Sequence, residues 1–471
     1  MMKKKARTGF LFLLFFLALA SLIHAFPKAV RSLKTPPLRS LTGVVTGITV
    51  ETLTLRDSGG EVHEFTITGA VRSGRPGTFG GDIFSVWYDE PLSETGDHLQ
   101  ARQYKKLADG PRVPDNSLPE TIPSDWRDGG IFQDSYAAAY ETLKTLTPEQ
   151  KIGQIFFARF PENQYAVGTV NRYQPGGFLL FAEDFKRKSK EDVAAMLEQV
   201  QKASALPLLI ATDEEGGPVV RVSGHARLRD KPFPSPQELY KSGGLDAVRR
   251  DAEEKSRFLK ELGINLNLAP VADVSADPKD YIYGRTVGLP AEETGAYVKT
   301  VVEAAQSSGI SATLKHFPGY GNNRDTHTGS ARDKRPYERF EREDFFPFRE
   351  GIAAGVHSIL VSHNIVECMD SKNPASLSPA VHAILRENLG FTGVVMTDDL
   401  YMDAVAEQES TLSPAVEAVL AGNDLLIITD LAGGSRQVLE AVENGVIEKE
   451  QLNRAVFRIL AWKYHVGLLP S

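Results

Sequence analysis

The chain has very little cysteine and no excess of basic residues. Cys368 is the one cysteine in 471 residues, so no disulfide can form within the chain and packing must stabilise it. The formal net charge is -8, and no basic run lies outside the N-terminus. Nucleic-acid binding favours a basic face, so the charge argues against a nucleic-acid partner.

Two phosphate-binding motifs are also missing. Gly216-Gly217 is a glycine pair, but neither G-x-G-x-x-G nor a P-loop is present. Close metal-ligand spacing is absent as well, so neither a metal nor another cofactor is expected. The weaker metal alternative requires distant residues to converge. They are His316, His327, His363, Asp213 and Asp398.

The N-terminus has the organisation of an export signal. Four basic residues precede a run of apolar and small residues at 9–23, and Ala25 provides a small residue before a cleavage point. We therefore predict a signal peptide at 1–25 and export to the periplasm or the extracellular space. A retained anchor in the inner membrane is the alternative, although the run is short for a membrane span.

Residues 40–105 are rich in short alternating strand patterns, separated by turn signals such as Asp57-Ser58-Gly59-Gly60. Four or five strands in so short a stretch predict a small β-rich module, either a barrel or a sandwich. Its role is not readable from the sequence. Proline and polar turn formers at 109–119 indicate a linker, which we place at 106–135.

From residue 136 the pattern changes to apolar runs that alternate with amphipathic segments. Eight repeats over 136–471 favour an α/β fold of the (β/α)₈ barrel type over an open doubly wound sheet. The expected strands are Ile155–Phe157, Gly177–Phe181, Leu208–Ala211, Leu266–Ala269, Ala312–Leu314, Ser358–Val361, Val394–Met396 and Leu425–Ile428.

Polar residues follow the expected strands, and in such a barrel the carboxyl ends of the strands form one rim. This predicts a pocket lined by carboxylates and cations, suited to a polyhydroxylated ligand. Asp398, directly after a strand, is a candidate nucleophile or base, while a helix cap is the alternative for it and for Asp399. His327 lies two residues beyond Asp325, which would orient it for proton transfer. A carboxylate and a proton donor on either side of a sugar bond are what glycoside hydrolysis needs.

Several motifs in this region resemble glycoside hydrolase family 3, in its single-barrel β-N-acetylglucosaminidase branch. The matching stretches are Asp213–Arg221, Arg285–Gly288, Lys315–Gly319, Asp325–His327 and Thr397–Leu400. The resemblance implies a retaining hydrolase in which Asp398 is the nucleophile and His327, paired with Asp325, is the acid/base. It also implies that the terminal sugar is bound by Asp213, Arg221, Arg285, Lys315 and His316.

One departure lies between two motifs. The loop before Asp325 is one residue shorter than usual in this branch, and Tyr320 stands where histidine or leucine is usual. With export, the expected substrates are peptidoglycan fragments or chitin-type oligosaccharides that contain N-acetylglucosamine. The alternatives are a family 3 β-glycosidase or phosphorylase of other specificity, and a non-catalytic glycan-binding barrel.

Overall fold

An eight-stranded parallel sheet forms the centre of the protein. The computed structural model describes residues 38–74, 77–78, 81–88, 99–110, 118–323, 331–402 and 410–470. The strands lie in chain order around the sheet: β7 (Phe156–Arg159), β8 (Gly177–Leu180), β9 (Leu209–Thr212), β12 (Leu266–Asn267), β13 (Ser311–Phe317), β15 (Ser358–Val361), β17 (Val394–Thr397) and β18 (Leu426–Ile428).

The first and last of these strands meet, so the sheet closes into a barrel. β18 pairs with β7, and a bridge from Met396 to Leu425 joins β17 to the start of β18. The strands are buried almost throughout, as expected for a parallel sheet that helices cover. The predicted (β/α)₈ barrel is confirmed, and every expected strand overlaps an observed one. The largest difference is at β13, which continues three residues beyond the predicted end, to Phe317.

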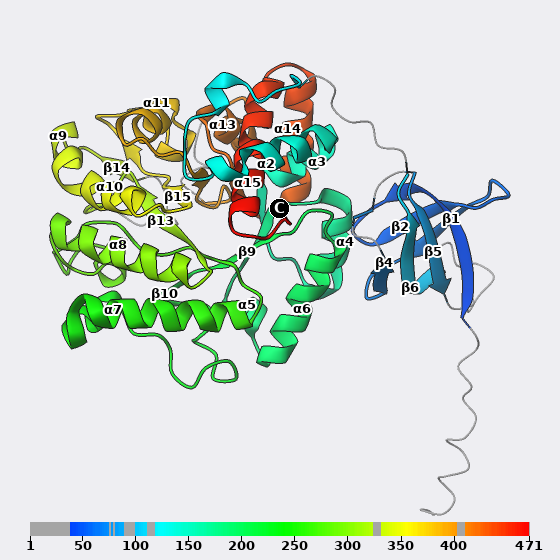
Figure 1. The fold of residues 1–471 in the computed structure, drawn as a ribbon, viewed down its shortest axis with the longest axis horizontal. Coiled ribbons are helices and arrows are strands. Elements are labelled where there is room, and N and C mark those ends of the chain that lie inside the picture. The colour runs from blue at the N-terminus through cyan, green and yellow to red at the C-terminus, as the bar shows by residue number, and fades with distance from the viewer. Residues whose placement is uncertain are drawn as a thin grey trace, which may run out of the picture.

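Helices surround the barrel on its outside (Figure 1). The longer ones are α2 (Tyr136–Thr145), α4 (Asn163–Tyr173), α6 (Lys190–Ala203), α7 (Pro236–Glu261), α8 (Ala291–Ser307), α10 (Phe345–Ala353), α14 (Leu431–Glu443) and α15 (Lys449–His465). Shorter ones are α3 (Pro148–Gln154), α5 (Ala182–Phe185), α9 (Tyr337–Arg339), α11 (Pro379–Ala383) and α13 (Pro414–Ala421). Local sequence fixes where several begin: Ser189 and Ser235 form capping boxes that start α6 and α7.

A separate six-stranded sheet precedes the barrel. Its strands are β1 (Arg39–Ile48), β2 (Thr52–Arg56), β3 (Val62–Thr66), β4 (Val71–Gly74), β5 (Ile83–Tyr88) and β6 (Leu99–Ala108). β3 also pairs with β6, which closes the sheet into a small barrel around Leu53, Leu55, Phe65 and Phe84. Of the two predicted alternatives, the structure therefore has the barrel rather than the sandwich.

The segment predicted as a linker at 106–135 is partly built into the two barrels. β6 continues to Ala108, while Trp126 and Phe132 are buried in the core of the large barrel. Trp126 packs against Tyr140 and Phe457. The connecting stretch is thus shorter than the sequence indicated, because a Pro-rich composition does not reveal that two aromatic side chains find partners far along the chain.

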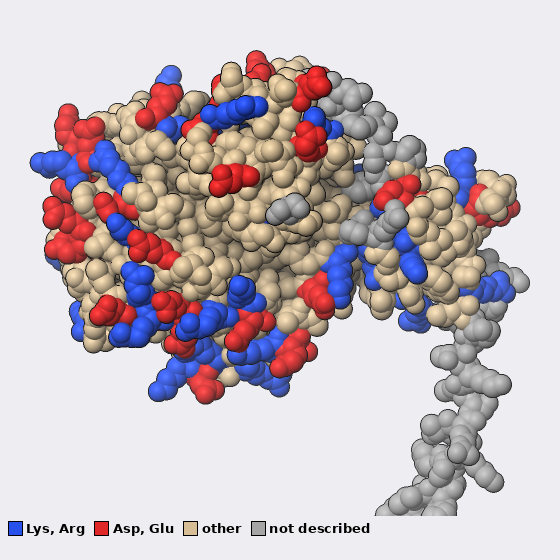
Figure 2. All heavy atoms as spheres, viewed as in Figure 1, with Lys and Arg blue, Asp and Glu red and all other residues tan. Residues whose placement is uncertain are grey.

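The predicted signal at 1–25 lies outside the described residues. Within the described ranges, no helix combines the length and the apolar character that a membrane crossing requires. Acidic and basic side chains are interspersed over the face of the molecule in Figure 2.

The small barrel packs directly against helices α4 and α6 of the large one. The Asn171 amide donates a buried hydrogen bond to the Tyr104 hydroxyl at 3.0 Å, and Gly77 N donates to Ala203 O at 2.7 Å. At Gly168 the carbonyl of Val50 comes so close that an added Cβ would lie 1.8 Å from its oxygen. Only glycine allows this approach of a backbone to a helix.

We expect Gly168→Ala to weaken the packing of the small barrel on α4. The added methyl group overlaps a backbone atom, and overpacking of this kind costs about 1–3 kcal/mol. Thermal unfolding should show a lower Tm, and limited proteolysis should cut faster between the two barrels. Gly284→Ala is the control, because a Cβ there meets no atom within 4 Å. Equal behaviour of the two variants would contradict a tight contact at Gly168.

Candidate active site

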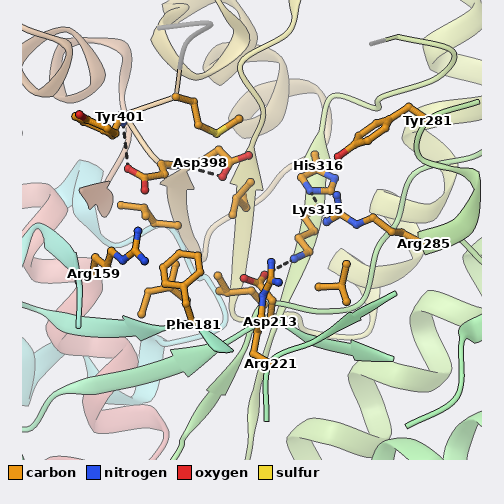
Figure 3. A pocket seen from close by; sticks show the side chains of 17 residues that line it. Arg159, Phe181, Asp213, Arg221, Tyr281, Arg285, Lys315, His316, Asp398 and Tyr401 are labelled. Carbon is orange, nitrogen blue, oxygen red and sulfur yellow. Dashed lines mark hydrogen bonds and ion pairs between the residues drawn. The ribbon is translucent and has the colours of Figure 1, made fainter. Parts of the chain in front are cut away.

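A pocket of about 440 Å³ opens at the carboxyl ends of the barrel strands. Its volume is in the range of small-molecule sites. Every described residue that the sequence predicted for the site lines it: Asp213, Arg221, Arg285, Lys315, His316 and Asp398. Figure 3 shows these side chains converging on the pocket from different parts of the barrel rim. Further lining residues include Arg159, Phe181, Tyr281, Asp399, Tyr401 and Met402.

One wall of the pocket is a network of paired charges. Lys315 Nζ lies 2.6 Å from Asp213 Oδ1 and 2.6 Å from Glu215 Oε1. Arg285 forms a bidentate pair with Glu215, at 2.7 Å from NH2 and 3.0 Å from Nε. Such fork-shaped pairs fix geometry as well as charge. The two cations are therefore held in place before any ligand binds.

Glu215 is the buried centre of this network. Burial by itself raises the pKa of a carboxyl group, but the charges of Lys315 and Arg285 outweigh burial here. The pKa of Glu215 consequently lies well below its usual range, and the side chain is ionised. Arg285 in turn has a raised pKa, because Glu215 more than compensates for the burial of the guanidinium group.

The neighbouring Glu214 has a different task, although it stands next to Glu215 in the chain. It lies in the short strand β10 (Glu214–Gly216), which pairs with β11 (Val219–Val220), and its carboxylate accepts backbone N–H groups of Arg221, Val222 and Ser223. This fixes the loop that carries Arg221 into the pocket. The Nε of Arg221 is buried and has no hydrogen-bond partner within the described part of the chain. It is available for a ligand.

His316 is held in one orientation by groups on both of its ring nitrogens. Nδ1 lies 2.8 Å from Asp273 Oδ2, and Arg285 NH2 lies 3.2 Å from Nε2. A guanidinium group can only donate, so Nε2 accepts and the proton is on Nδ1. Asp273 also accepts the backbone N–H groups of His316 and Tyr320. The Asp273 carboxylate thus fixes the orientation of the His316 ring and the conformation of the turn that follows.

Tyr320, where this chain departs from the family pattern, is buried next to the pocket. Its ring packs edge-on against His316 at 5.4 Å and lies 5.9 Å from Tyr281, which lines the pocket. The Tyr320 ring therefore packs against both His316 and Tyr281. Its contacts account for an aromatic residue at this position.

We expect Asp273→Asn to reduce kcat/KM about 10²-fold, because His316 and its turn lose their fixed acceptor and small displacements at an active site have effects of that size. Steady-state kinetics will measure it. Asp277→Asn, at an exposed position in the same loop, is the control and should retain full activity. An unchanged kcat/KM in Asp273→Asn would contradict a positioning role.

Asp398 follows β17 and reaches the pocket opposite the charge network (Figure 3). Its backbone N donates to Val361 O, and its Oδ1 accepts the N–H of Asp399 at 2.9 Å. The carbonyl of Asp399 accepts from His363 Nε2 at 3.0 Å, so the turn behind Asp398 is anchored to the preceding strand end. Asp399 itself accepts the N–H of Tyr401. That bond closes a local turn, while a helix that Asp399 could cap would lie outside the described residues.

Burial raises the pKa of Asp399, and the charge of Asp398 adds to this effect. Asp325 and His327 lie outside the described residues, so their roles rest on the motif alone. The metal alternative gains no support from His316 and His363, since protein groups already engage both ring nitrogens of each.

Sequence reasoning missed several residues of this site. Glu215 stands inside a matched motif, but its burial between two cations is visible only in the structure. Asp273 comes shortly after the expected strand Leu266–Ala269. This position indicates that it lies at the rim, but it does not indicate that it orients His316. Arg159 also ends a strand, β7, and carried the same weak signal.

Comparison with known proteins identifies the family of this chain. A family model described as "Glycosyl hydrolase family 3 N terminal domain" matches residues 147–462. A β-N-acetylglucosaminidase/β-glucosidase of Cellulomonas fimi is 30% identical over 354 residues, which are 72% of this chain and 61% of that protein. The β-hexosaminidase LpqI of Mycobacterium tuberculosis is 28% identical over 333 residues, 68% of this chain and 83% of the relative.

A solved structure of a family 3 enzyme is also similar to this chain. The family 3 β-N-acetylglucosaminidase from Paenibacillus sp. superimposes with a TM-score of 0.64 at 32% identity, over 69% of this chain and 63% of its own. The chain thus spans less than two thirds of the length of the Cellulomonas and Paenibacillus proteins. Its match to LpqI covers most of that relative.

Proposed function

Because the chain belongs to glycoside hydrolase family 3 and is a glycoside hydrolase, we propose that it releases terminal β-linked N-acetylglucosamine from glycans, as an exo-acting retaining enzyme. The observation that supports this most is the position of Asp398. It faces a pocket whose opposite wall presents ordered cations and carboxylates. Relatives named for N-acetylglucosaminidase and hexosaminidase activity support the choice of sugar.

In the proposed mechanism Asp398 attacks the anomeric carbon and forms a glycosyl-enzyme intermediate, while the bond to the leaving group breaks. His327, paired with Asp325, would donate a proton to the leaving oxygen and then take one from the water that hydrolyses the intermediate. His327 donates this proton from its protonated form and is then neutral, whereas a second carboxyl group would be left negatively charged near Asp398. The residues themselves supply every group of this reaction, and no cofactor takes part.

The terminal sugar would be bound by Asp213, Arg221, Arg285, Lys315 and His316. Lys315 Nζ has three donors and two carboxylate neighbours, which leaves a donor for a sugar hydroxyl. Among the described residues Asp213 is paired only with Lys315, through Oδ1, so Oδ2 can accept a hydrogen bond from a sugar hydroxyl group. A site that is ordered before binding loses little entropy when the sugar enters.

Two substrate classes fit this proposal. The basic and apolar N-terminus supports export, and an exported enzyme meets peptidoglycan fragments or chitin-type oligosaccharides. Assays on N-acetylglucosaminyl-N-acetylmuramic acid and on chitobiose separate the two classes. Failure on both would contradict the proposal.

The nucleophile is tested by mass spectrometry after incubation with a fluorinated N-acetylglucosamine analogue that slows hydrolysis of the intermediate. We expect a covalent adduct on the peptide that contains Asp398. An adduct on another carboxylate would move the nucleophile, and an intact protein with released sugar would contradict the retaining mechanism.

A further inference from the structure

Two residues on either side of the proposed acid/base motif are joined by a hydrogen bond. Asn323 directly precedes residues 324–330, which carry Asp325 and His327, and Asp333 comes shortly after them. The Asn323 amide donates to Asp333 Oδ2 at 2.7 Å, across ten positions of the chain. Both side chains are buried. The two ends of the segment that carries the motif are therefore held together by groups that the proposed chemistry does not use.

Each end of this segment is also fixed to the barrel. Nδ2 and the backbone N of Asn323 both donate to Tyr320 O, at 2.8 and 3.1 Å, in the turn that follows β13. At the other end, β14 (Arg332–Asp333) pairs with β16 (Ile365–Val366), which follows β15. Strands β13 and β15 are neighbours in the barrel. The bond from Asn323 to Asp333 thus joins the segments that follow two adjacent strands.

Arg335 organises the carboxylates at this junction. Its Nε donates to Asp333 Oδ2 at 2.9 Å. Its NH1 lies 3.0 and 2.9 Å from the two carboxylate oxygens of Asp344, which directly precedes α10. NH2 donates to Gly319 O at 3.2 Å, in the turn after β13. One guanidinium group therefore bridges two buried carboxylates and the turn that leads to Asn323.

The turn packs tightly on the pair of Arg335 and Asp344. Gly319 and Gly321 have positive φ angles of 125° and 54°, which glycine adopts without the strain that a Cβ causes. An added Cβ at Gly319 would overlap the Asp344 carboxylate, and one at Gly321 would overlap the Arg335 guanidinium group. The backbone of the turn lies directly against both side chains. Because the contact is close-packed, a change at Arg335 must displace the turn.

We propose that Arg335 is a positioning residue for proton transfer, which acts through Asp333 and Asn323 on the segment that carries the acid/base. These three residues are not among the described residues that line the pocket, so their effect is indirect. Fixing both ends of a short segment reduces the conformations that its middle can adopt. Misplacing a reacting group by about 1 Å can cost about 10²-fold in rate. This inference rests on the proposed function and adds residues on which its acid/base depends.

The test compares two aryl N-acetylglucosaminides that differ in their need for a proton. Dinitrophenolate leaves readily without one, whereas phenolate is a poor leaving group and depends on general-acid catalysis. The ratio of the two kcat/KM values therefore reports the proton donor. This ratio does not depend on the fraction of the protein that is folded, because both substrates meet the same enzyme.

We expect Arg335→Gln and Asn323→Ala to lower kcat/KM for the phenyl substrate about tenfold to a hundredfold. The value for the dinitrophenyl substrate should change less than about threefold, since that step needs no acid. Arg335→Lys keeps the charge but loses the fork, so it should retain part of the wild-type ratio. Arg335→Gln also leaves two carboxylates buried without their cation and should lower the Tm. If it does not fold, Asn323→Ala, which removes a single side chain, and Arg335→Lys still decide the question.

Two variants of exposed residues are the matched controls. Arg339 pairs with Glu343 at 3.0 Å, four positions after Arg335, and its side chain is exposed. Asn373 donates to Asp370 Oδ2 at 3.0 Å, an exposed counterpart of the bond from the Asn323 amide. Arg339→Gln and Asn373→Ala should keep the wild-type ratio. An unchanged ratio in Asn323→Ala or in folded Arg335→Gln, or an equal loss for both substrates, would overturn the proposal.

His327→Ala separates this inference from the proposed function. If His327 is the acid/base, this variant loses turnover of the phenyl substrate and keeps kcat/KM for the dinitrophenyl substrate. With that result, an unchanged ratio in Asn323→Ala overturns only the inference. Wild-type behaviour of His327→Ala on both substrates would overturn the acid/base assignment and the inference with it. A wild-type protein that hydrolyses neither substrate would contradict the proposed function itself.

Discussion

Replacing Asp398 with asparagine should lower kcat by about 10⁴-fold or more, the size of effect measured when a nucleophile is removed from a preorganised site. The amide keeps the shape of the side chain and can still accept the N–H of Asp399, so folding should be unaffected. What is lost is the negative charge that attacks the anomeric carbon. Steady-state kinetics on an aryl N-acetylglucosaminide measures the effect, and circular dichroism checks the fold.

Asp399→Asn is the control for this experiment. It changes the next residue in the same way, and its side chain contacts Tyr401 N and the Thr429 hydroxyl rather than the reacting atoms. We expect a loss of no more than about 10²-fold, from displacement of the turn. Near-normal turnover in Asp398→Asn would contradict the assignment of Asp398 as the nucleophile. A larger loss of kcat in Asp399→Asn than in Asp398→Asn would contradict it as well.

Glu215→Gln should destabilise the folded protein by about 3–5 kcal/mol, because it leaves Lys315 and Arg285 buried with too little negative charge. The side chain of Glu215 is only 2% exposed, so water cannot replace it. Urea unfolding at pH 7 measures the change. Activity should fall as well, since both cations belong to the proposed sugar site.

The pH dependence of this effect has a definite sign. The pKa of Glu215 is lowered in the folded protein from its ordinary value of 4.5, so the folded state binds fewer protons than the unfolded chain. The stability that Glu215 contributes is therefore complete well above pH 4.5 and is lost as the pH falls below that value. The difference between wild type and Glu215→Gln should be largest at pH 7 and shrink in acid.

Glu261→Gln provides the comparison. Glu261 pairs with Lys190 at 3.2 Å, but its side chain is 63% exposed. Exposed pairs of this kind contribute about 0–1 kcal/mol, so this variant should unfold almost like the wild type. A cost below 1 kcal/mol for Glu215→Gln as well would contradict a buried, tightly coupled network.

The sequence alone determined the barrel and the composition of its rim. Eight apolar runs at regular intervals have few alternatives, because buried parallel strands need continuous apolar stretches and helices to cover them. Once the strands are known, residues at their carboxyl ends must share one rim. This is why Asp213, Lys315 and Asp398 were predicted together and were found lining one pocket.

Tertiary structure alone decided which of these side chains touch. Glu214 and Glu215 are neighbours in the chain, yet one fixes the loop before Ser223 and the other pairs with two cations. Adjacent residues in an extended strand point to opposite sides, and the sequence does not say which side faces the pocket. The small barrel follows the same rule, since its contact at Gly168 depends on a backbone from another part of the chain.

Long-range pairing is the common reason. Lys315 meets Asp213 across 102 positions, and His316 meets Asp273 across 43. Each of these bonds depends on how the strands are staggered around the barrel, which local periodicity does not encode. Sequence therefore identified the residue types that the chemistry needs. The tautomer of His316, the ionised state of Glu215 and the position of Arg159 at the rim could be assigned only from the closed barrel.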